Sequence, residues 1–247
     1  MIRYAFTFAD GTRAVFEVDE NTPPSRTPRS SEGLPACMDM DTHRCSACPM
    51  PKRARLVCPA FDAILPTIQA FDRRGSSETC ELTVQQNGVT HLMSTSVQNA
   101  VRSLIGLQLA LSGCPVMSRL RPMAQFHIPL SDADQTLFRV FGMYMLKQYL
   151  RLIKGGTPDW SLAQLQAFYD DVHLVNQQLA ARIRAATQQD AVVNGLVILD
   201  VLGRAVQRDI QSHLERLAPR FETLFSVHKP TGFSTITARV PDSAAAN

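Results

Sequence analysis

Hydrophobic and polar residues alternate over residues 2 to 18, and this pattern predicts two antiparallel strands. Ile2, Tyr4, Phe6 and Phe8 share one face of the first strand. A side-chain period of two is typical of a half-buried strand. The pair Asp10-Gly11 follows, and Asp-Gly favours the type I′ turn of a tight hairpin. The chain therefore begins with a predicted β-hairpin.

A second hairpin is predicted over residues 80 to 93, where apolar residues alternate before and after Asn87-Gly88. Cys80 falls on the apolar face of this hairpin, so we interpret it as a buried small hydrophobe. Between the hairpins, apolar residues recur at helical spacing from Pro59, and Pro66 should bend or shorten that helix. The N-terminal third thus has the predicted order ββαββ.

Helical periodicity dominates the rest of the chain. It predicts helices from Ser96 to Gly113, from 131 to 155, from 159 to 186 and from about Asp190 to Leu214. In the second of these, seven apolar residues are predicted to bury most of the circumference: Leu137, Val140, Phe141, Tyr144, Met145, Tyr149 and Leu152.

The predicted fold class is α+β, with a small antiparallel sheet of two hairpins packed on a C-terminal helical bundle. The expected parts are the hairpin sheet with an inserted cysteine-rich loop (1–95), the helical bundle (96–228) and a loose tail (229–247), forming one compact unit. Residues 21–36 hold four prolines without apolar periodicity and are predicted to be a loop.

Composition and charge exclude several classes of protein. With 45% hydrophobic and 19% charged residues, the chain is too apolar to be disordered. Its net charge of +3 gives no strong nucleic-acid signal. No apolar stretch is long enough for a membrane span, and the first residues predict no signal peptide. We therefore expect a cytoplasmic protein, in which six cysteines serve as thiols or metal ligands and not as disulfides.

The spacing of the cysteines predicts a metal site. Cys45 and Cys48 form a Cys-x-x-Cys pair, whose tight turn brings two thiolates to one ion, and Cys58 follows after nine residues. Cys114 is the predicted fourth ligand because it follows directly on a helix end. The predicted metal ligands are therefore Cys45, Cys48, Cys58 and Cys114, with Cys37 or His43 as alternatives to Cys114.

Local charges suit such a site. Cys58 is predicted to be the N-cap of the helix that Pro59 opens, where the helix dipole favours a thiolate. Four thiolates around a divalent ion leave two excess negative charges. Four cations of the same loop are expected either to offset this excess or to form an ordinary solvated face: Arg44, Lys52, Arg53 and Arg55.

The identity of the metal stays open between two main alternatives. Zn²⁺ is expected for four cysteines in a reducing compartment. A [4Fe-4S] cluster is the alternative, because Cys48, Cys58 and Cys114 each precede proline, as the last ligand of bacterial ferredoxin runs does. Monovalent copper, favoured by nearby methionines, and free thiols without metal are further interpretations.

Other polar residues have ordinary interpretations beside functional ones. His127 lies near Arg119 and Arg121 in the sequence and either lines an anion pocket or is a satisfied loop histidine. Asp200 is predicted to form an ion pair with Arg204 one turn later, and Asn176 to fix the register of the bundle. No phosphate-loop, dinucleotide, zinc-protease or hydrolase motif is present, so the sequence names no catalytic set and no partner.

The sequence resembles a bacterial protein family of unknown function. The resemblance rests on Tyr4 to Gly11, the Cys-x-x-Cys-Pro loop with its later Cys-Pro, the segment 112–122 (SGCPVMSRLRP), Phe126 to Leu130, and the starts at Pro158 and Asp190. It spans about residues 2 to 210, and the SGCPVM segment is its most specific part. It implies that the four cysteines match family positions and implies no activity.

These observations lead to two hypotheses. In the first, a cytosolic protein uses a closed four-cysteine metal site to join the sheet layer to the helical bundle. In the second, an iron-sulfur enzyme or electron carrier has its cluster at the edge of a pocket lined by His127 and the arginines. If the site is reactive, Cys114 is the ligand expected to be absent, and His127 and Arg121 should face the same cavity.

Overall fold

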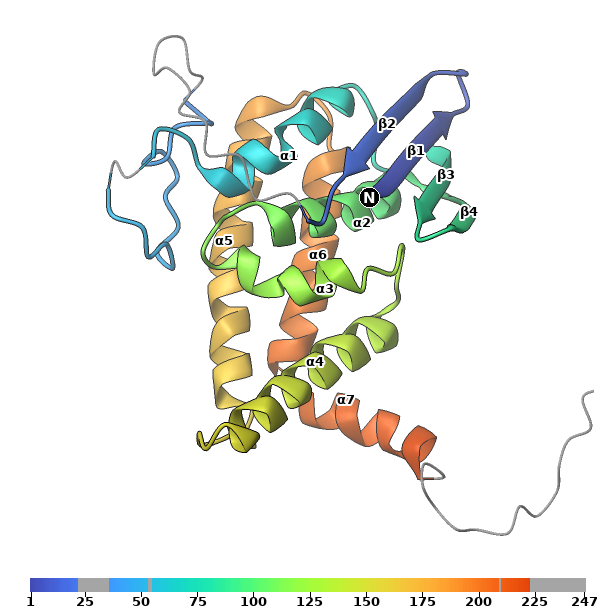
Figure 1. Cartoon of the computed structure of the whole chain (residues 1–247). Helices are drawn as coiled ribbons and strands as arrows, with labels where there is room; N and C mark the ends of the chain where they lie inside the picture. The colour runs from blue at the N-terminus through green and yellow to red at the C-terminus, as the bar shows by residue number, and fades with distance from the viewer. Residues whose placement is uncertain (22–35, 53–54, 209, 223–247) are drawn as a thin grey trace, which may run out of the picture. The chain divides into compact units, whose positions relative to one another are not determined.

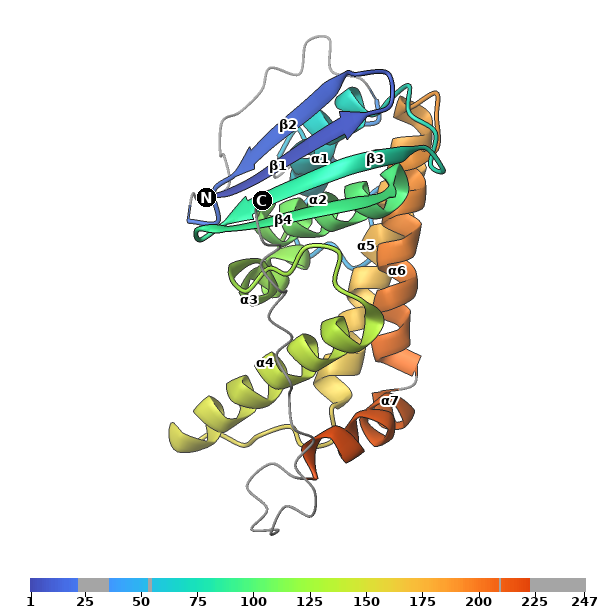
Figure 2. The same cartoon turned by 90° about the vertical axis from the view of Figure 1, so that its right-hand side faces the viewer.

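The four predicted strands form a single antiparallel sheet. The computed structural model describes residues 1–21, 36–52, 55–208 and 210–222. The strands are β1 (Ile2–Phe8), β2 (Arg13–Val18), β3 (Thr79–Gln86) and β4 (Val89–Ser96), in the order β2-β1-β3-β4. The long pairing of β1 with β3 joins the two hairpins, so the sheet is continuous from edge to edge (Figure 2).

The two hairpin turns differ. Asn87 and Gly88 both have positive φ, 51° and 78°, as a type I′ turn requires. The prediction of the same turn at Asp10-Gly11 is wrong, because only Gly11 has positive φ. Asp10 instead caps the turn, and its carboxylate accepts a hydrogen bond from the Thr12 amide at 3.0 Å.

Aromatic residues fill the space between the sheet and helices α1 (Pro59–Ala70) and α2 (Val97–Leu111). Phe71, directly after α1, packs edge-on against Phe6 with ring centroids 4.9 Å apart. Tyr4, Phe6 and Cys80 are all buried, as the alternation predicted. Helices α1 and α2 therefore cover one face of the sheet (Figure 2).

The remaining helices follow in sequence order. The elements are η1 (Met117–Leu120), α3 (Arg121–Gln125), α4 (Ala133–Ile153), α5 (Ala163–Ala186), α6 (Ala191–Arg208), α7 (Ile210–Leu217) and η2 (Ala218–Phe221). Helices α5 and α6 lie side by side, and α6 also packs on α2 (Figure 1). Among the helices that the structure describes, none is long and apolar enough to cross a bilayer.

The chain divides into two units, Met1–Ile210 and Gln211–Asn247. The first holds the sheet and all helices through α6. The predicted loose tail at 229–247 and nearly all of the predicted loop at 21–36 lie outside the described residues.

Helix α5 begins at Ala163 rather than at Asp159, where the prediction placed it. Asp159 is nevertheless important for this start. Its carboxylate accepts hydrogen bonds from the Gln164 amide at 2.8 Å and from the Tyr144 hydroxyl of α4 at 2.6 Å. A hydrogen bond from the Ser161 hydroxyl, and then these two bonds, lower the Asp159 pKa to about 2. Asp159 thus caps α5 from outside the helix and ties it to α4.

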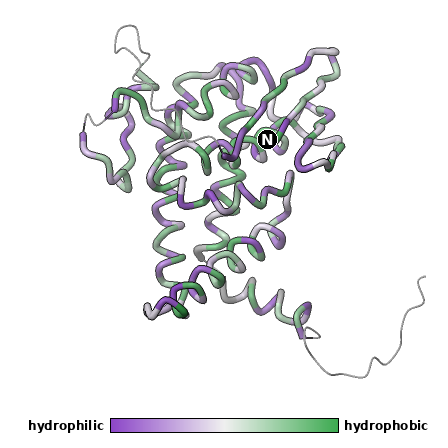
Figure 3. The backbone as a smooth tube through the Cα atoms, viewed as in Figure 1, coloured by the Kyte–Doolittle hydropathy of each residue, from purple (hydrophilic) through white to green (hydrophobic). Residues whose placement is uncertain are grey.

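The predicted burial of α4 is partly wrong. Leu137 and Val140 are buried, but Tyr149 is 56% exposed and Leu152 47% exposed. Apolar and polar positions alternate along this helix (Figure 3). Periodicity shows which residues share a helix face, but it does not show whether another element covers that face.

Candidate functional site

Four cysteines from three segments line one cavity. Cys45 and Cys48 come from the loop before α1, Cys58 from the start of α1, and Cys114 from the connection between α2 and η1. The Cys48 amide donates to the Cys45 carbonyl at 3.0 Å, which closes the Cys-x-x-Cys turn. These are the four residues that the sequence predicted as ligands.

The loop that carries the first two cysteines is closed at its base. Asp39 and Val57 form an isolated antiparallel bridge, and the Met40 amide donates to the Leu56 carbonyl at 2.9 Å. The Cys58 amide donates to the Met38 carbonyl at 3.2 Å. The bridge brings both ends of the loop to the start of α1, where Cys58 is the N-cap and Pro59 the first helical residue, as predicted.

Cys114 is held by the turn that ends α2. Gly113 has a φ of 72°, which a side chain would strain, and this conformation turns the chain directly after the helix. Burial raises the pKa of the Cys114 thiol, while hydrogen bonds from the backbone amides of Met117 and Val116 act in the opposite direction. Amides directed at a sulfur stabilise its thiolate form, which is the form that binds metal.

The thiols of the cavity are close enough to influence one another. Burial and then the neighbouring Cys48, Cys114 and Cys58 raise the pKa of Cys45 to about 12. Four negative sulfurs in this space therefore need a positive charge among them. Within the described part of the chain, no three Cys, His, Asp or Glu side chains lie in metal-binding geometry, so the four sulfurs would have to move closer together to share one ion.

Arg182 of α5 lines the same cavity, and no motif in the sequence pointed to it. It is 1% exposed, and its guanidinium donates to the carbonyls of Cys37 and Asp39, each at 2.6 Å, and of Met40 at 3.2 Å. Among the described residues, no carboxylate forms an ion pair with it, although its charge, after hydrogen bonds from Thr42 and Asp41, helps to lower the pKa of Asp39. Arg182 comes seven residues, or two helical turns, after the buried Val175, so it lies on the apolar stripe of α5. This spacing could have identified Arg182 as a buried arginine.

Of the other residues that the sequence singled out near the cysteines, some line this cavity and some do not. His43 and Arg44 line the cavity, whereas Cys37, Lys52 and Arg55 do not. Arg53 lies outside the described residues. Cys37 is connected to the site through its backbone carbonyl, which accepts a hydrogen bond from Arg182.

His127 faces a second and larger cavity of about 150 Å³ between helices α2 to α6. Its Nε2 atom forms a hydrogen bond with the Tyr4 hydroxyl, which also bonds Ser103 Oγ at 2.8 Å. Burial, and then the charges of Arg139 and His91, lower the His127 pKa to about 4. His127 is therefore neutral near pH 7.

The arginines predicted beside His127 lie elsewhere. Arg119 stacks on Phe168, 4.2 Å from the ring centroid, and Arg121 donates to the Glu20 carbonyl at 2.9 Å. Neither arginine lines the cavity of His127, and His127 does not line the cavity of the cysteines. The cations near His127 are Arg102 and Arg139 instead.

The predicted ion pair of Asp200 with Arg204 is wrong. Asp200 pairs with His173 of α5 at 2.9 Å, and it accepts a hydrogen bond from the Asn176 amide at 3.1 Å. Asp200 is in α6, so these contacts join α5 to α6. The helices pack closely enough that a partner on the neighbouring helix replaces the one a turn away.

Fold and cavities define an α+β protein with a thiol-lined cavity between its cysteine loop and its helices. Residues 2–222 match the family model described as a domain of unknown function (DUF6901), and the chain belongs to this family. No curated protein and no solved structure gives a significant match to the chain.

Proposed function

We propose that this protein binds one metal ion through Cys45, Cys48, Cys58 and Cys114, and that the ion joins the cysteine loop to helices α1 and α2. The observation that supports this best is the position of Arg182. Burying a cation without an anion is costly, by several kcal/mol. Four thiolates around Zn²⁺ carry a net charge of −2 and would provide the missing anion in the cavity that Arg182 lines.

The surroundings suit a thiolate centre in other respects as well. Arg44 lines the cavity and supplies a second cation, although it also forms an ion pair with Asp41, with Nη1 and Oδ1 3.1 Å apart. No Asp or Glu is among the described residues that line the cavity, so the sulfurs are its source of negative charge. All six cysteines are free, and the proposal includes a cytoplasmic location, where thiols remain reduced.

Zn²⁺ is the proposed metal, with a closed shell of four protein ligands. A [4Fe-4S] cluster is the second candidate, and the three Cys-Pro pairs favour it. The two candidates differ in visible absorption, because Zn²⁺ has a filled d shell and no colour, whereas the cluster is brown.

The test is the metal content of full-length protein purified anaerobically. We expect one zinc per chain by elemental analysis, no visible absorption, and the spectrum of a tetrahedral thiolate site after Co²⁺ substitution. Cys48→Ser should lose the metal and lower the melting temperature, because binding energy in such a site is folding energy. Cys80→Ser is the control, since Cys80 is buried in the sheet, and it should keep the full metal content. Equal metal loss in both variants would contradict the assignment of ligands.

Arg182 gives a second test that leaves all cysteines in place. Arg182→Met should weaken zinc binding at least tenfold in a chelator competition, because the charge that balances the thiolates is gone. Arg184→Met changes an exposed arginine of the same helix and should leave zinc affinity unchanged. The same zinc affinity in both variants would show that Arg182 has only a packing role.

A further inference from the structure

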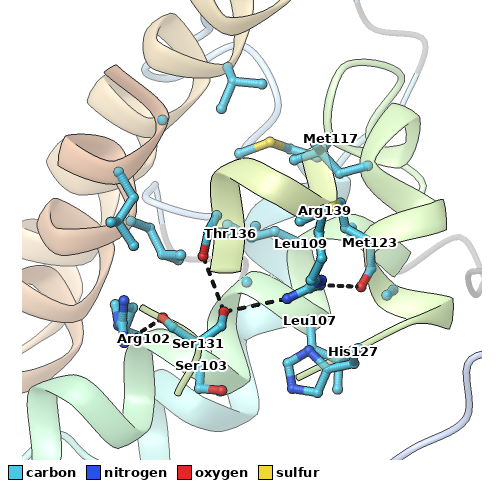
Figure 4. A pocket seen from close by; sticks show the side chains of 18 of the residues that line it. Arg102, Ser103, Leu107, Leu109, Met117, Met123, His127, Ser131, Thr136 and Arg139 are labelled. Atoms are coloured by element: carbon cyan, nitrogen blue, oxygen red, sulfur yellow. Dashed lines mark hydrogen bonds between the residues drawn. The ribbon is translucent and has the colours of Figure 1, made fainter. Parts of the chain in front are cut away.

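The second cavity has an apolar body and one charged end. Its apolar lining comes from α2, α5, α6 and the segment around η1 and α3, and includes Leu107, Met117, Met123, Val172, Leu199 and Val206. Its charged lining residues are Arg102 of α2 and Arg139 of α4, which lie on either side of Ser131 (Figure 4). An apolar pocket with a few convergent polar groups is the usual form of a small-molecule site.

Neither arginine has an anionic partner in the part of the chain that the structure describes. Arg102 donates to the Ser131 carbonyl at 3.5 Å, and Arg139 donates to Ser131 Oγ at 3.4 Å and to the Met123 carbonyl at 2.9 Å. These acceptors are all neutral. In addition, the Nε–H groups of Arg102 and Arg139 are buried without an acceptor. Buried donors and charges without partners are unfavourable, so an anion bound at this end would stabilise both arginines.

Within the described ranges, no acidic side chain supplies the missing charge. Among the described residues that line the cavity, none is Asp or Glu. The other polar groups at this end are neutral: Ser103, Ser131, Thr136 and His127. The two guanidiniums therefore create a positive end in a pocket that is otherwise apolar.

We propose that this cavity binds a small amphipathic carboxylate, with the carboxylate between Arg102 and Arg139 and an apolar body among the helices. A carboxylate offers two oxygens to guanidinium donors and is the anion that arginine recognises through paired hydrogen bonds. A cavity of 150 Å³ has the size of one that holds benzene, so a ring or a short acyl chain fits the apolar part.

The cavity is separate from the cysteine site. The two sets of lining residues share no member, although α5 contributes Asn176 to one and Gln178 to the other. Carboxylate binding can therefore be tested on protein that has kept its metal, and its failure would leave the proposed metal site unaffected.

Calorimetric titration of the full chain with octanoate tests the proposal. We expect one octanoate per chain, with acetate and octan-1-ol each binding at least tenfold more weakly, because one lacks the apolar body and the other the charge. Arg139→Gln should weaken octanoate binding at least tenfold and leave octanol binding unchanged. Arg151→Gln, on the same helix but outside the cavity, is the matched control and should bind octanoate as the wild type does.

A measurement on the wild type covers the case in which Arg139→Gln does not fold. Met117 and Met123 line the cavity, and bound octanoate should give nuclear Overhauser contacts to their methyl groups. Octanoate that binds no more tightly than octanol, that is insensitive to Arg139→Gln in a folded variant, or that contacts neither methionine would overturn the proposal.

Discussion

At the scale of single residues, the described part of the molecule is distinguished by three cavity-lining arginines, one buried and two half-buried, that form no ion pair with a carboxylate. Arg182 lines the cysteine cavity, and Arg102 and Arg139 line the larger one. Neither cavity has an Asp or Glu among its described lining residues. A protein interior tolerates such charges when an anion accompanies them. A metal-thiolate centre in one cavity and a carboxylate ligand in the other would supply these anions.

His127 gives a residue-level prediction for the effect of pH on stability. Its pKa is about 4 in the folded protein, because it is buried and faces Arg139 of α4, His91 of β4 and the Tyr4 hydroxyl of β1. In the unfolded chain a histidine has a pKa of about 6.5. Between these two values the unfolded chain binds a proton that the folded protein does not. The free energy of unfolding should therefore fall by up to about 3 kcal/mol as the pH drops from 6.5 to 4.

Urea unfolding at a series of pH values measures this slope. His127→Gln keeps a side chain that can hydrogen-bond Tyr4 but does not titrate, so the slope between pH 6.5 and 4 should become flatter. Asp10 and Asp159, whose pKa values are lowered to about 2, lose most of their contribution below pH 4, and the small part lost above pH 4 is the same in both proteins. An unchanged slope in His127→Gln would show that the pH dependence has another source.

At the scale of elements, the crossing of α6 over α2 depends on glycine. A Cβ atom added at Gly195 would lie 3.1 Å from both the Arg102 amide nitrogen and the Gln98 carbonyl oxygen of α2. Backbone atoms of a packed helix cannot yield as the end of a side chain can. The absence of a side chain at Gly195 thus sets how closely the two helices approach, and Arg102 is positioned by the same contact.

Gly195→Ala should therefore destabilise the protein by about 1–2 kcal/mol, because overpacking outweighs the gain of up to about 1 kcal/mol in helix propensity. Gly142→Ala in α4 is the control, since nothing lies within 4 Å of the added Cβ there. It should stabilise the protein by up to about 1 kcal/mol. Thermal unfolding of the two variants should give shifts of opposite sign, and a stabilised Gly195→Ala would mean that α2 and α6 separate easily.

The elements also show what could and could not be predicted from the sequence. Both hairpins and the start of α1 at Cys58-Pro59 are specified locally, by alternation, by Asn-Gly and by proline, so the sequence predicted them correctly. The partner of Asp200 and the exposed face of α4 depend on which helix lies alongside, and there the predictions were wrong. The role of Arg182 and the charged end of the larger cavity went unnoticed for the same reason, because several helices must pack before these groups meet.

At the scale of the whole molecule, the proposed metal would join parts that have little else to hold them together. The sheet and its helices have a continuous aromatic core, to which Phe6 and Phe71 belong. Among the described residues, the loop before α1 is attached by the bridge of Asp39 with Val57, by Arg182 and by the buried Met38 and Met40. Its remaining attachment in the proposal is the ion, which connects it to Cys58 and Cys114.

Removal of the metal should therefore affect the two parts unequally. After chelation we expect a lower melting temperature and faster tryptic cleavage at Arg44 and Lys52, because the loop loses its link to the helices. Amide hydrogen exchange in β1 and β3 should stay slow, since the sheet core does not include the site. Cleavage at the same rate with and without chelator would argue against a metal in the loop, and lost protection in β1 and β3 would mean that the ion supports the whole fold.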